Sequence, residues 1–195
     1  MGETKTSAAL LIVDIINPLD YDGAAPLCRA ATAIVEPLRQ LRLAADAAGM
    51  PVVYVNDNHG AWHSESSEVV RHVVQSDAPG RDIAERLQPR ERDYFVIKPQ
   101  FSGFYATTLP ALLPRLGVNR LVLAGIAADM CVLFTAADAH MREYALWVPR
   151  DVVAGEDDQR TKWALEIMRN SFGAETRPTD ELSLADWIEA TRHDR

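Results

Sequence analysis

The sequence is short of several features on which common functions depend. No apolar run approaches the roughly 20 residues that cross a bilayer, so we expect no membrane partner. Only two cysteines, Cys28 and Cys131, occur in 195 residues. Two thiols in a chain of this size indicate reduced residues, not a disulfide framework. The first residues lack a basic region followed by a long apolar stretch, so we expect a cytoplasmic location.

Positive charge is scarce as well. Acidic residues outnumber basic residues by 28 to 20, and the formal net charge of −8 argues against a general affinity for nucleic acid. Phosphate-binding signatures are absent, because the sequence has neither GxGxxG after its first apolar run nor GxxxxGK[ST]. The GxSxG elbow of serine α/β-hydrolases is missing too. With 48% apolar residues, we expect one folded domain, residues 1–195.

What the chain does contain is an alternation of two patterns. Short, nearly continuous apolar runs rich in β-branched or aromatic residues predict buried strands. They cover residues 8–15, 51–57, 94–99, 119–126 and 144–151. Amphipathic stretches between them predict helices over residues 25–49, 106–117, 129–144 and 159–174, and Pro37 is expected to kink or split the first. This order is typical of an α/β fold with a mostly parallel sheet.

Polar side chains stand where the predicted strands end. These positions are Asp14, Asp57, Lys98, the turn at 126–131 and Asp151. In a parallel sheet, ligands bind at the carboxyl ends of the strands. A carboxylate such as Asp14 at the edge of a core is costly unless it has a partner or a function. The convergence therefore predicts an active site at this edge.

Three of these residues have complementary chemistry. Cys131 falls in the first turn of a predicted helix, where the helix dipole lowers the pKa of a thiol and backbone N–H groups can hold an oxyanion. Lys98 would favour the thiolate, and Asp14 could take the thiol proton. Each has a purely structural alternative: a core cysteine, a solvent-reaching lysine, and a helix cap or salt-bridge partner. Together they predict a nucleophile, a base and an electrostatic partner.

These segments resemble the isochorismatase-like cysteine hydrolases, which include nicotinamidase and N-carbamoylsarcosine amidase. The resemblance covers nearly the whole chain. It is carried by LLIVDIIN with Asp14 and Asn17, VIKPQFSGFYATTL with Lys98, and GIAADMCVLFTAADAHMREYALWVPRD with Cys131. It implies that Asp14, Lys98 and Cys131 form a catalytic triad that cleaves an amide, urea or carbamoyl-type C–N bond of a small molecule through a thioester, without a cofactor.

The resemblance also implies structural details. It predicts a three-layer, Rossmann-like fold with a six-stranded sheet, assembled as a homodimer or homotetramer. It predicts a cis peptide bond between Ile126 and Ala127, and an oxyanion hole formed by the backbone N–H groups of Ala127 and Cys131. Ile16 stands where many relatives have Gln, and Ala128 where many have Thr. These departures leave the triad intact and bear on the substrate class.

The substrate pocket and a metal site are further expectations. The predicted pocket residues are Asn17, Trp62, Phe101 and Phe104. Asp57 and His59 have the Asp-x-His spacing of the nicotinamidase metal site, with His63 and His72 following. However, His72 is typical of a helix, and the loop at 56–62 resembles that of metal-free relatives. We therefore expect no metal.

Several functions stay open as alternatives. They are a metal-dependent nicotinamidase-like amidase, an isochorismatase-type vinyl-ether hydrolase that needs no cysteine, and a non-enzymatic binding protein on the same fold. The sequence leaves open the identity of the substrate and whether a neighbouring subunit completes the pocket.

Overall fold

The computed structural model describes residues 7–58, 60 and 65–191. A sheet of six strands forms its centre. The strands are β1 (Ala8–Val13), β2 (Val52–Asp57), β3 (Tyr94–Lys98), β4 (Arg120–Ile126), β5 (Ala145–Trp147) and β6 (Val153–Ala154). Their order is β3-β2-β1-β4-β5, with β6 beside β4, and every pairing is parallel. The predicted α/β fold with a six-stranded parallel sheet is confirmed.

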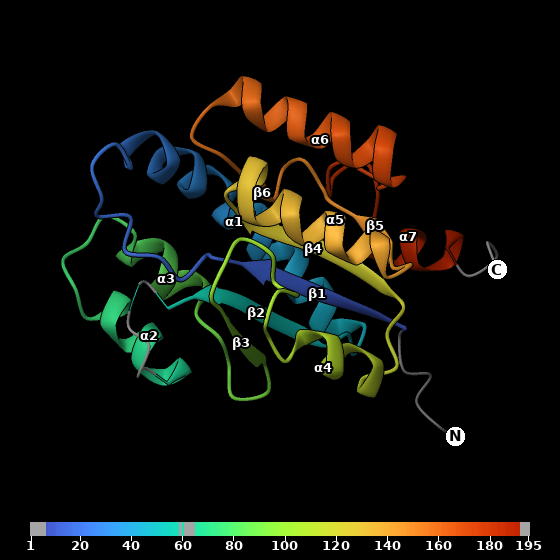
Figure 1. The fold of residues 1–195 in the computed structure, drawn as a ribbon, viewed down its shortest axis with the longest axis horizontal. Coiled ribbons are helices and arrows are strands. Elements are labelled where there is room, and N and C mark those ends of the chain that lie inside the picture. Colours follow the sequence, from blue (N-terminus) through green and yellow to red (C-terminus); the bar gives the residue numbers. More distant parts are fainter. Residues whose placement is uncertain (1–6, 59, 61–64, 192–195) are drawn as a thin grey trace.

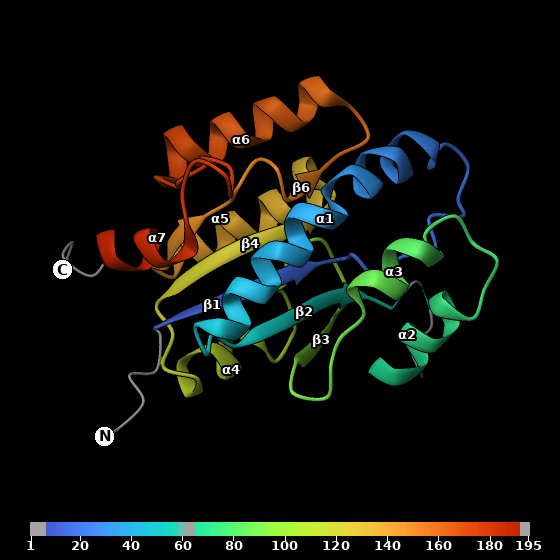
Figure 2. The ribbon, with the colours of Figure 1, turned by 180° about the vertical axis from the view of Figure 1, so that it is seen from behind.

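Helices cover both faces of the sheet, as Figures 1 and 2 show from opposite sides. One face packs against α1 (Ala25–Ala47), α2 (Ser66–Val74), α3 (Arg81–Leu87) and α7 (Leu184–Ala190). The other packs against α4 (Leu109–Arg115), the π-helical turn η1 (Ala128–Val132), α5 (Leu133–Met141) and α6 (Asp158–Phe172). The three predicted layers are therefore present.

Strand β1 shows why the sheet needs cover on both sides. All six of its residues are buried, and their side chains alternate between the two faces. Leu10 and Ile12 join the core beneath α1, whereas Leu11 and Val13 join the core beneath α4 and α5. Each such side chain contributes about 1.5–3 kcal/mol when it is fully buried. A nearly continuous apolar run is thus the local signature of a central strand.

Some expectations about individual elements are wrong. Pro37 does not split helix α1, because the buried apolar stripe of the helix holds it on the sheet where the proline removes a backbone donor; whether the proline kinks the helix stays a prediction. The run at 144–151 yields only the short strand β5, and β6 lacks a recognisable pattern of its own. Of two tryptophans in the second half of the chain, Trp147 of β5 is fully buried, whereas Trp163 of α6 is 56% exposed.

The strand order positions a crevice at one end of the sheet. After β3 the chain crosses to the opposite side of β1 and forms β4, so the connections that follow β1 and β4 lead in different directions. The two strands approach closely at Gly125, whose φ is +114° and where an added Cβ atom would lie 2.0 Å from the Val13 carbonyl oxygen. This close pairing holds the carboxyl ends of β1 and β4 side by side.

None of the helices in the described ranges combines the length and apolar character that a membrane crossing requires.

Candidate active site

Asp14, Lys98 and Cys131 meet at the carboxyl end of the sheet. The Lys98 ammonium nitrogen lies 2.8 Å from Asp14 Oδ2 and 3.5 Å from Cys131 Sγ. Asp14 and Cys131 line the same cavity and interact electrostatically. The three residues come from the ends of β1 and β3 and from η1, which follows β4. The structure thus brings together the three side chains that the sequence singled out.

The backbone around Asp14 is held by the neighbouring strand. Asp14 has a positive φ of 49°, and its amide donates to the Val55 carbonyl oxygen at 3.0 Å. Its carboxylate Oδ1 accepts a hydrogen bond from the Asp57 amide at 2.7 Å. These contacts leave Oδ2 facing Lys98. Position and orientation of the carboxylate are therefore set by β2.

Asn56 is a positioning residue that the sequence analysis missed. Its side chain is fully buried at the end of β2. Asn56 Oδ1 accepts from the Ile16 amide at 3.1 Å, and Nδ2 donates to the Ile16 carbonyl at 2.9 Å. A buried amide must satisfy its hydrogen bonds, and Asn56 does so by fixing the chain that leaves Asp14. An asparagine inside an apolar strand, next to Asp57, was the available signal.

Burial and charge set the protonation of the ion pair. Asp14 is 5% exposed and Lys98 is 1% exposed. Burial raises the pKa of Asp14 above its ordinary value of 3.8, although Lys98 opposes the shift. For Lys98, burial favours the neutral amine, but the charges of Asp14 and Cys131 outweigh it and raise the pKa above 10.5. Lys98 is therefore an ammonium ion at neutral pH, paired with Asp14.

The thiol of Cys131 behaves differently from the sequence-based expectation. Burial, followed by the negative charge of Asp14, raises the pKa of Cys131 to about 12. Lys98 opposes this shift but does not overcome it. One cation cannot neutralise two buried anions, so the thiolate is disfavoured while Asp14 is ionised. The expectation of a lowered thiol pKa is wrong, and thiolate formation requires transfer of the proton to Asp14.

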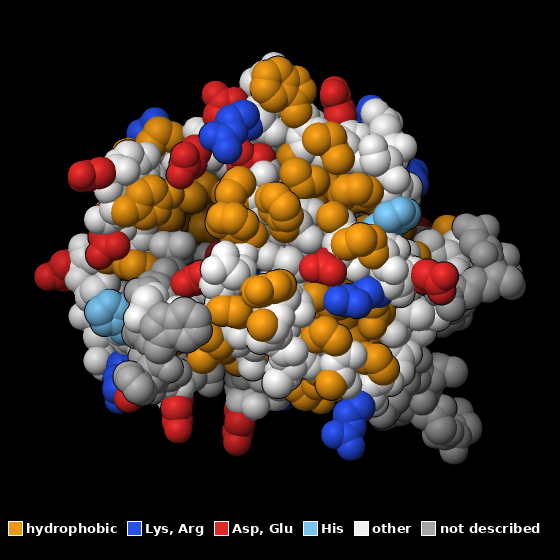
Figure 3. Space-filling view, in the orientation of Figure 1, with side chains coloured by type: hydrophobic (Ala, Val, Ile, Leu, Met, Phe, Trp, Pro, Cys, Tyr) orange, Lys and Arg blue, Asp and Glu red, His pale blue; other side chains and the backbone are white. Residues whose placement is uncertain are grey.

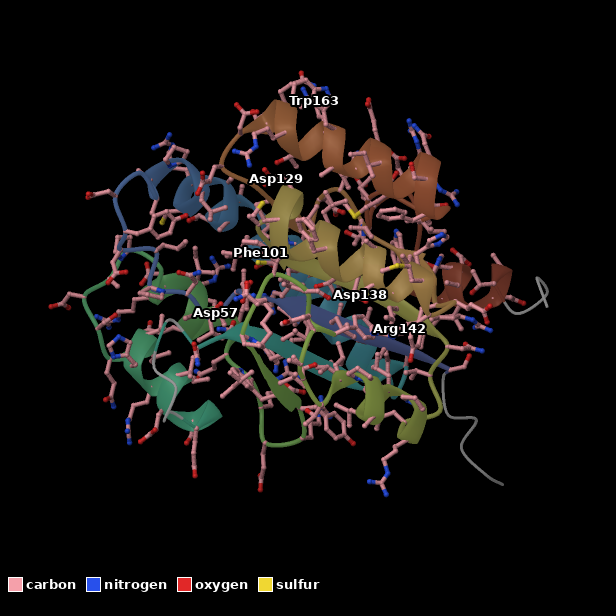
Figure 4. All side chains as sticks on the ribbon, in the orientation of Figure 1. Asp57, Phe101, Asp129, Asp138, Arg142 and Trp163 are labelled. Carbon is pink, nitrogen blue, oxygen red and sulfur yellow. The ribbon has the colours of Figure 1, made fainter. Side chains whose placement is uncertain are left out.

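A cavity of about 410 Å³ opens onto this group. Its lining includes the predicted residues Asn17 and Phe101, together with Asp20, Tyr21 and Asp57. Figure 4 shows Asp57 and Phe101 at the same end of the sheet, whereas Asp138 lies further along α5 and Arg142 directly follows that helix. The ring of Phe101 packs on Phe134 of α5, with 5.7 Å between the ring centroids. The cavity is thus bounded by aromatic rings and carboxylates.

Phe104, by contrast, does not line this cavity. It is 2% exposed, and its ring packs against Tyr144 with the Arg142 guanidinium 5.1 Å above it. The loop is fixed to α5 where the Gly103 amide donates to Thr135 Oγ1 at 3.0 Å, which directs Phe104 into the core. The expectation that Phe104 is a pocket residue is wrong. Trp62, the remaining predicted pocket residue, lies outside the described residues.

Asp151, another residue at a predicted strand end, has a structural role. Its carboxylate accepts hydrogen bonds from the backbone amide and the hydroxyl of Thr179, and it is not part of the cavity lining.

The metal-site question rests on residues that the structure does not describe. His59 and His63 lie outside the described residues, and His72 belongs to α2 as its pattern indicated. Within the described ranges, no group of three or more His, Cys, Asp or Glu side chains could hold a metal ion. The expectation of a metal-free site stays a prediction.

The turn that carries Cys131 has the backbone arrangement implied by the resemblance. The peptide bond between Ile126 and Ala127 is cis. The Ala127 carbonyl accepts hydrogen bonds from the amides of Met130 and Val132 at 3.1 and 3.2 Å, which closes the first turn of η1 around Cys131. The predicted oxyanion donors, the amides of Ala127 and Cys131, therefore stand at the start and in the middle of this turn.

Comparison with known proteins identifies the family to which this chain belongs. Residues 8–180 match the model of the isochorismatase domain. The chain belongs to the isochorismatase family. It is 36% identical to the uncharacterized isochorismatase family protein YaaI of Bacillus subtilis, over 92% of this chain and 98% of that protein.

Solved structures of this family share the fold. An isochorismatase family protein from Desulfovibrio vulgaris matches with a TM-score of 0.77 and 26% identity, over 94% of this chain and 99% of that chain. N-carbamoylsarcosine amidase from Thermoplasma acidophilum matches with a TM-score of 0.67 and 30% identity, over 90% of this chain and 98% of that chain. The predicted family, and with it a hydrolase of the isochorismatase type, is confirmed.

Proposed function

We propose that this isochorismatase-family protein is a cysteine hydrolase that cleaves an amide, urea or carbamoyl-type C–N bond of a small molecule through a thioester. The observation that carries the proposal is that Cys131, Asp14 and Lys98 line one cavity, with the Lys98 ammonium 3.5 Å from the Cys131 sulfur and 2.8 Å from Asp14. The likeness to a structure named as N-carbamoylsarcosine amidase supports the C–N bond as the target.

In the first half of the reaction, Asp14 takes the proton from Cys131 and the sulfur attacks the substrate carbonyl carbon. Because the proton stays within the triad, Lys98 faces one anion before and after the transfer. The backbone N–H groups of Ala127 and Cys131 stabilise the oxyanion. As the C–N bond breaks, Asp14 returns the proton to the leaving nitrogen, and a thioester on Cys131 remains.

In the second half, water replaces the departed amine. Asp14 removes a proton from this water, whose oxygen attacks the thioester carbonyl. The C–S bond then breaks, the acid product leaves, and the proton on Asp14 returns to the Cys131 sulfur. The raised pKa of Asp14 suits it to both proton transfers, because a group that must accept and then return a proton works best when its pKa lies near the working pH.

The test is ammonia release from a panel of small amides, ureas and carbamates. We expect Cys131→Ala to fold and to lose turnover by about a thousandfold or more on any substrate that the unmodified protein cleaves. The matched control is Cys28→Ala, since Cys28 lies on α1 with its thiol donating to the Pro79 carbonyl. This variant should retain full activity.

A second measurement reports the intermediate directly. Mass spectrometry of protein quenched in acid during turnover should show the acyl group of the substrate on the peptide that contains Cys131. Equal turnover by the unmodified protein and Cys131→Ala would contradict the thiol mechanism and favour chemistry of the vinyl-ether hydrolase kind.

Assembly and location complete the proposal. We propose a cytoplasmic homodimer or homotetramer. The two free cysteines support a reducing compartment. Exposed apolar side chains support assembly, and they gather over α5 and α6 on the face seen in Figure 3, among them Phe134, Met141, Trp163 and Ile167. Light scattering of the purified protein at several concentrations tests this, because a monomer at every concentration would contradict it.

A further inference from the structure

We propose that the cavity selects substrates whose non-reacting end carries a positive charge, such as an alkylammonium group, and that Asp20 and Asp57 recognise this end. The inference rests on the proposed function, because it assigns a substrate class to the same cavity. It is argued from the charges and aromatic rings that the cavity presents.

The charges of the lining are unbalanced. Asp14, Asp20 and Asp57 contribute carboxylates to the cavity, and Lys98 carries the one positive charge among the described residues that line it. Lys98 lies within 2.8 Å of Asp14, so the charges of this pair cancel. Three carboxylates against one ammonium group leave the described lining with a net negative charge. The protein's net charge of −8 adds to the negative potential of the opening.

The carboxylates of Asp20 and Asp57 are both exposed enough to meet a ligand. Asp20 is exposed in the segment that follows β1. The side chain of Asp57 is 38% exposed at the end of β2, and its Oδ2 lies 3.8 Å from the Lys98 ammonium, further away than Asp14. They therefore flank the triad on the solvent side, where the part of a substrate that extends away from Cys131 must lie.

Aromatic rings complete a surface that suits a cation. Phe101 and Tyr21 line the same cavity and are 47% and 46% exposed. The Tyr21 hydroxyl donates to Glu156 at 2.8 Å, which fixes the ring and brings another carboxylate to its hydroxyl edge. The face of an aromatic ring attracts an ammonium group, and a nearby carboxylate strengthens that attraction. An anionic substrate would meet like charges at the same positions.

Charged reagents that modify thiols test the charge selectivity of the cavity without knowledge of the substrate. The protein is Cys28→Ser, so that Cys131 is its single thiol. The reagents are the cationic 2-aminoethyl and the anionic 2-sulfonatoethyl methanethiosulfonates, which transfer groups of similar size. For each reagent, the rate constant of its reaction with Cys131 is divided by the rate constant of its reaction with 2-mercaptoethanol. The ratio of the two normalised rates reports the charge of the cavity, because the ionised fraction of the thiol cancels.

We expect the normalised ratio to favour the cationic reagent by about tenfold or more at low salt, and to fall as added salt screens the carboxylates. Adding Asp20→Asn and Asp57→Asn together should bring the ratio towards one. Adding Glu166→Gln instead, an exposed carboxylate on α6, should leave it unchanged. A ratio of one or less, or a ratio that survives the double substitution, would overturn the proposal.

A matched set of amides links this selectivity to turnover. β-Alaninamide, butanamide and succinamate present a cationic, a neutral and an anionic end on skeletons of similar length. They are measured as ligands that protect Cys131 from alkylation, and as substrates that release ammonia. We expect protection to be strongest for β-alaninamide and weakest for succinamate. The opposite order would overturn the charge selectivity and leave the thiol mechanism standing, whereas undiminished turnover in Cys131→Ala would refute the mechanism alone.

Discussion

Lys98 and Asp14 form an ion pair almost completely shielded from solvent, with 2.8 Å between Nζ and Oδ2 and side-chain exposures of 1% and 6%. The two residues come from strands separated in the sheet by β2. A buried charge of either sign is costly without its partner, so each residue offsets the desolvation cost of the other. The charges of the same pair also act on the ionisation of Cys131, which Asp14 disfavours and Lys98 favours. The pair therefore connects stability with catalysis.

Replacing Lys98 with methionine tests this connection. At pH 7 we expect Lys98→Met to lower the free energy of unfolding by roughly 3–5 kcal/mol, because Asp14 is left as an unpaired buried carboxylate. Without Lys98, the folded-state pKa of Asp14 rises further above the unfolded value of about 3.9. The folded state of the variant then binds a proton that the unfolded state does not, so its stability increases as the pH falls between these two pKa values.

Urea unfolding of Lys98→Met at several pH values measures this effect. The double variant Asp14→Asn/Lys98→Met supplies the control, since it removes both charges and should be more stable at pH 7 than Lys98→Met alone. A penalty that is the same at all pH values would show that lost packing, not the charge of Asp14, is responsible.

The pH dependence of turnover follows from the protonation of Asp14. The carboxylate must be ionised to accept the thiol proton, and burial raises its pKa above 3.8. We therefore expect kcat/KM for a neutral amide to fall on the acid side with a midpoint above the ordinary carboxyl range. Because the pKa of Lys98 is raised above 10.5, its deprotonation should cause no loss below that pH. An acid midpoint at or below 3.8 would contradict this assignment.

The thiol itself can be titrated by alkylation. In Cys28→Ser protein, the rate of iodoacetamide reaction with Cys131 should keep rising with pH towards its pKa of about 12. Adding Asp14→Asn should lower this pKa, because a neighbouring negative charge is removed while Lys98 stays. Glu166→Gln serves as a control that removes a distant carboxylate on α6. A thiol pKa that is unchanged by Asp14→Asn would show that burial alone sets it.

The close approach of β1 and β4 at Gly125 gives a prediction about folding. We expect Gly125→Ala to lower the free energy of unfolding by more than about 3 kcal/mol, since the φ of +114° is unfavourable for alanine and the added Cβ atom would collide with the Val13 backbone. Gly117→Ala is the matched control. Its φ is +71°, but nothing lies within 4 Å of the added atom, so it should cost only about 1 kcal/mol. Equal losses in thermal or urea unfolding would exclude the steric contribution.

The local sequence was sufficient to locate the four strands β1 to β4 and the reactive residues. Apolar runs such as LLIVDI and NRLVLAGI predict buried strands because hydrophobic burial depends on the composition of a short segment. The positions of Asp14 and Lys98 at strand ends follow directly, and parallel strands place such ends at one edge. Phe101 and Phe104 could not be separated in this way, because both are apolar and near one another in the sequence.

Which aromatic faces the cavity was decided by contacts between distant segments. Hydrogen bonds between the Phe104 loop and α5, including Gly103 to Thr135, direct one ring inward and leave the other at the opening. The protonation of Cys131 was decided in the same way. Its place in a helical turn and its cationic neighbour indicated a lowered pKa, but burial and the Asp14 carboxylate raise it.

The sequence by itself determined the order of strands β1 to β4, the family and the identity of the three reactive side chains, because these depend on residue types at fixed positions along the chain. The tertiary structure alone decided the depth at which each group is buried, the pairing of Lys98 with Asp14 and the excess of carboxylates around the cavity. Desolvation and Coulomb interactions depend on distances through space, and those distances exist only once the strands have assembled.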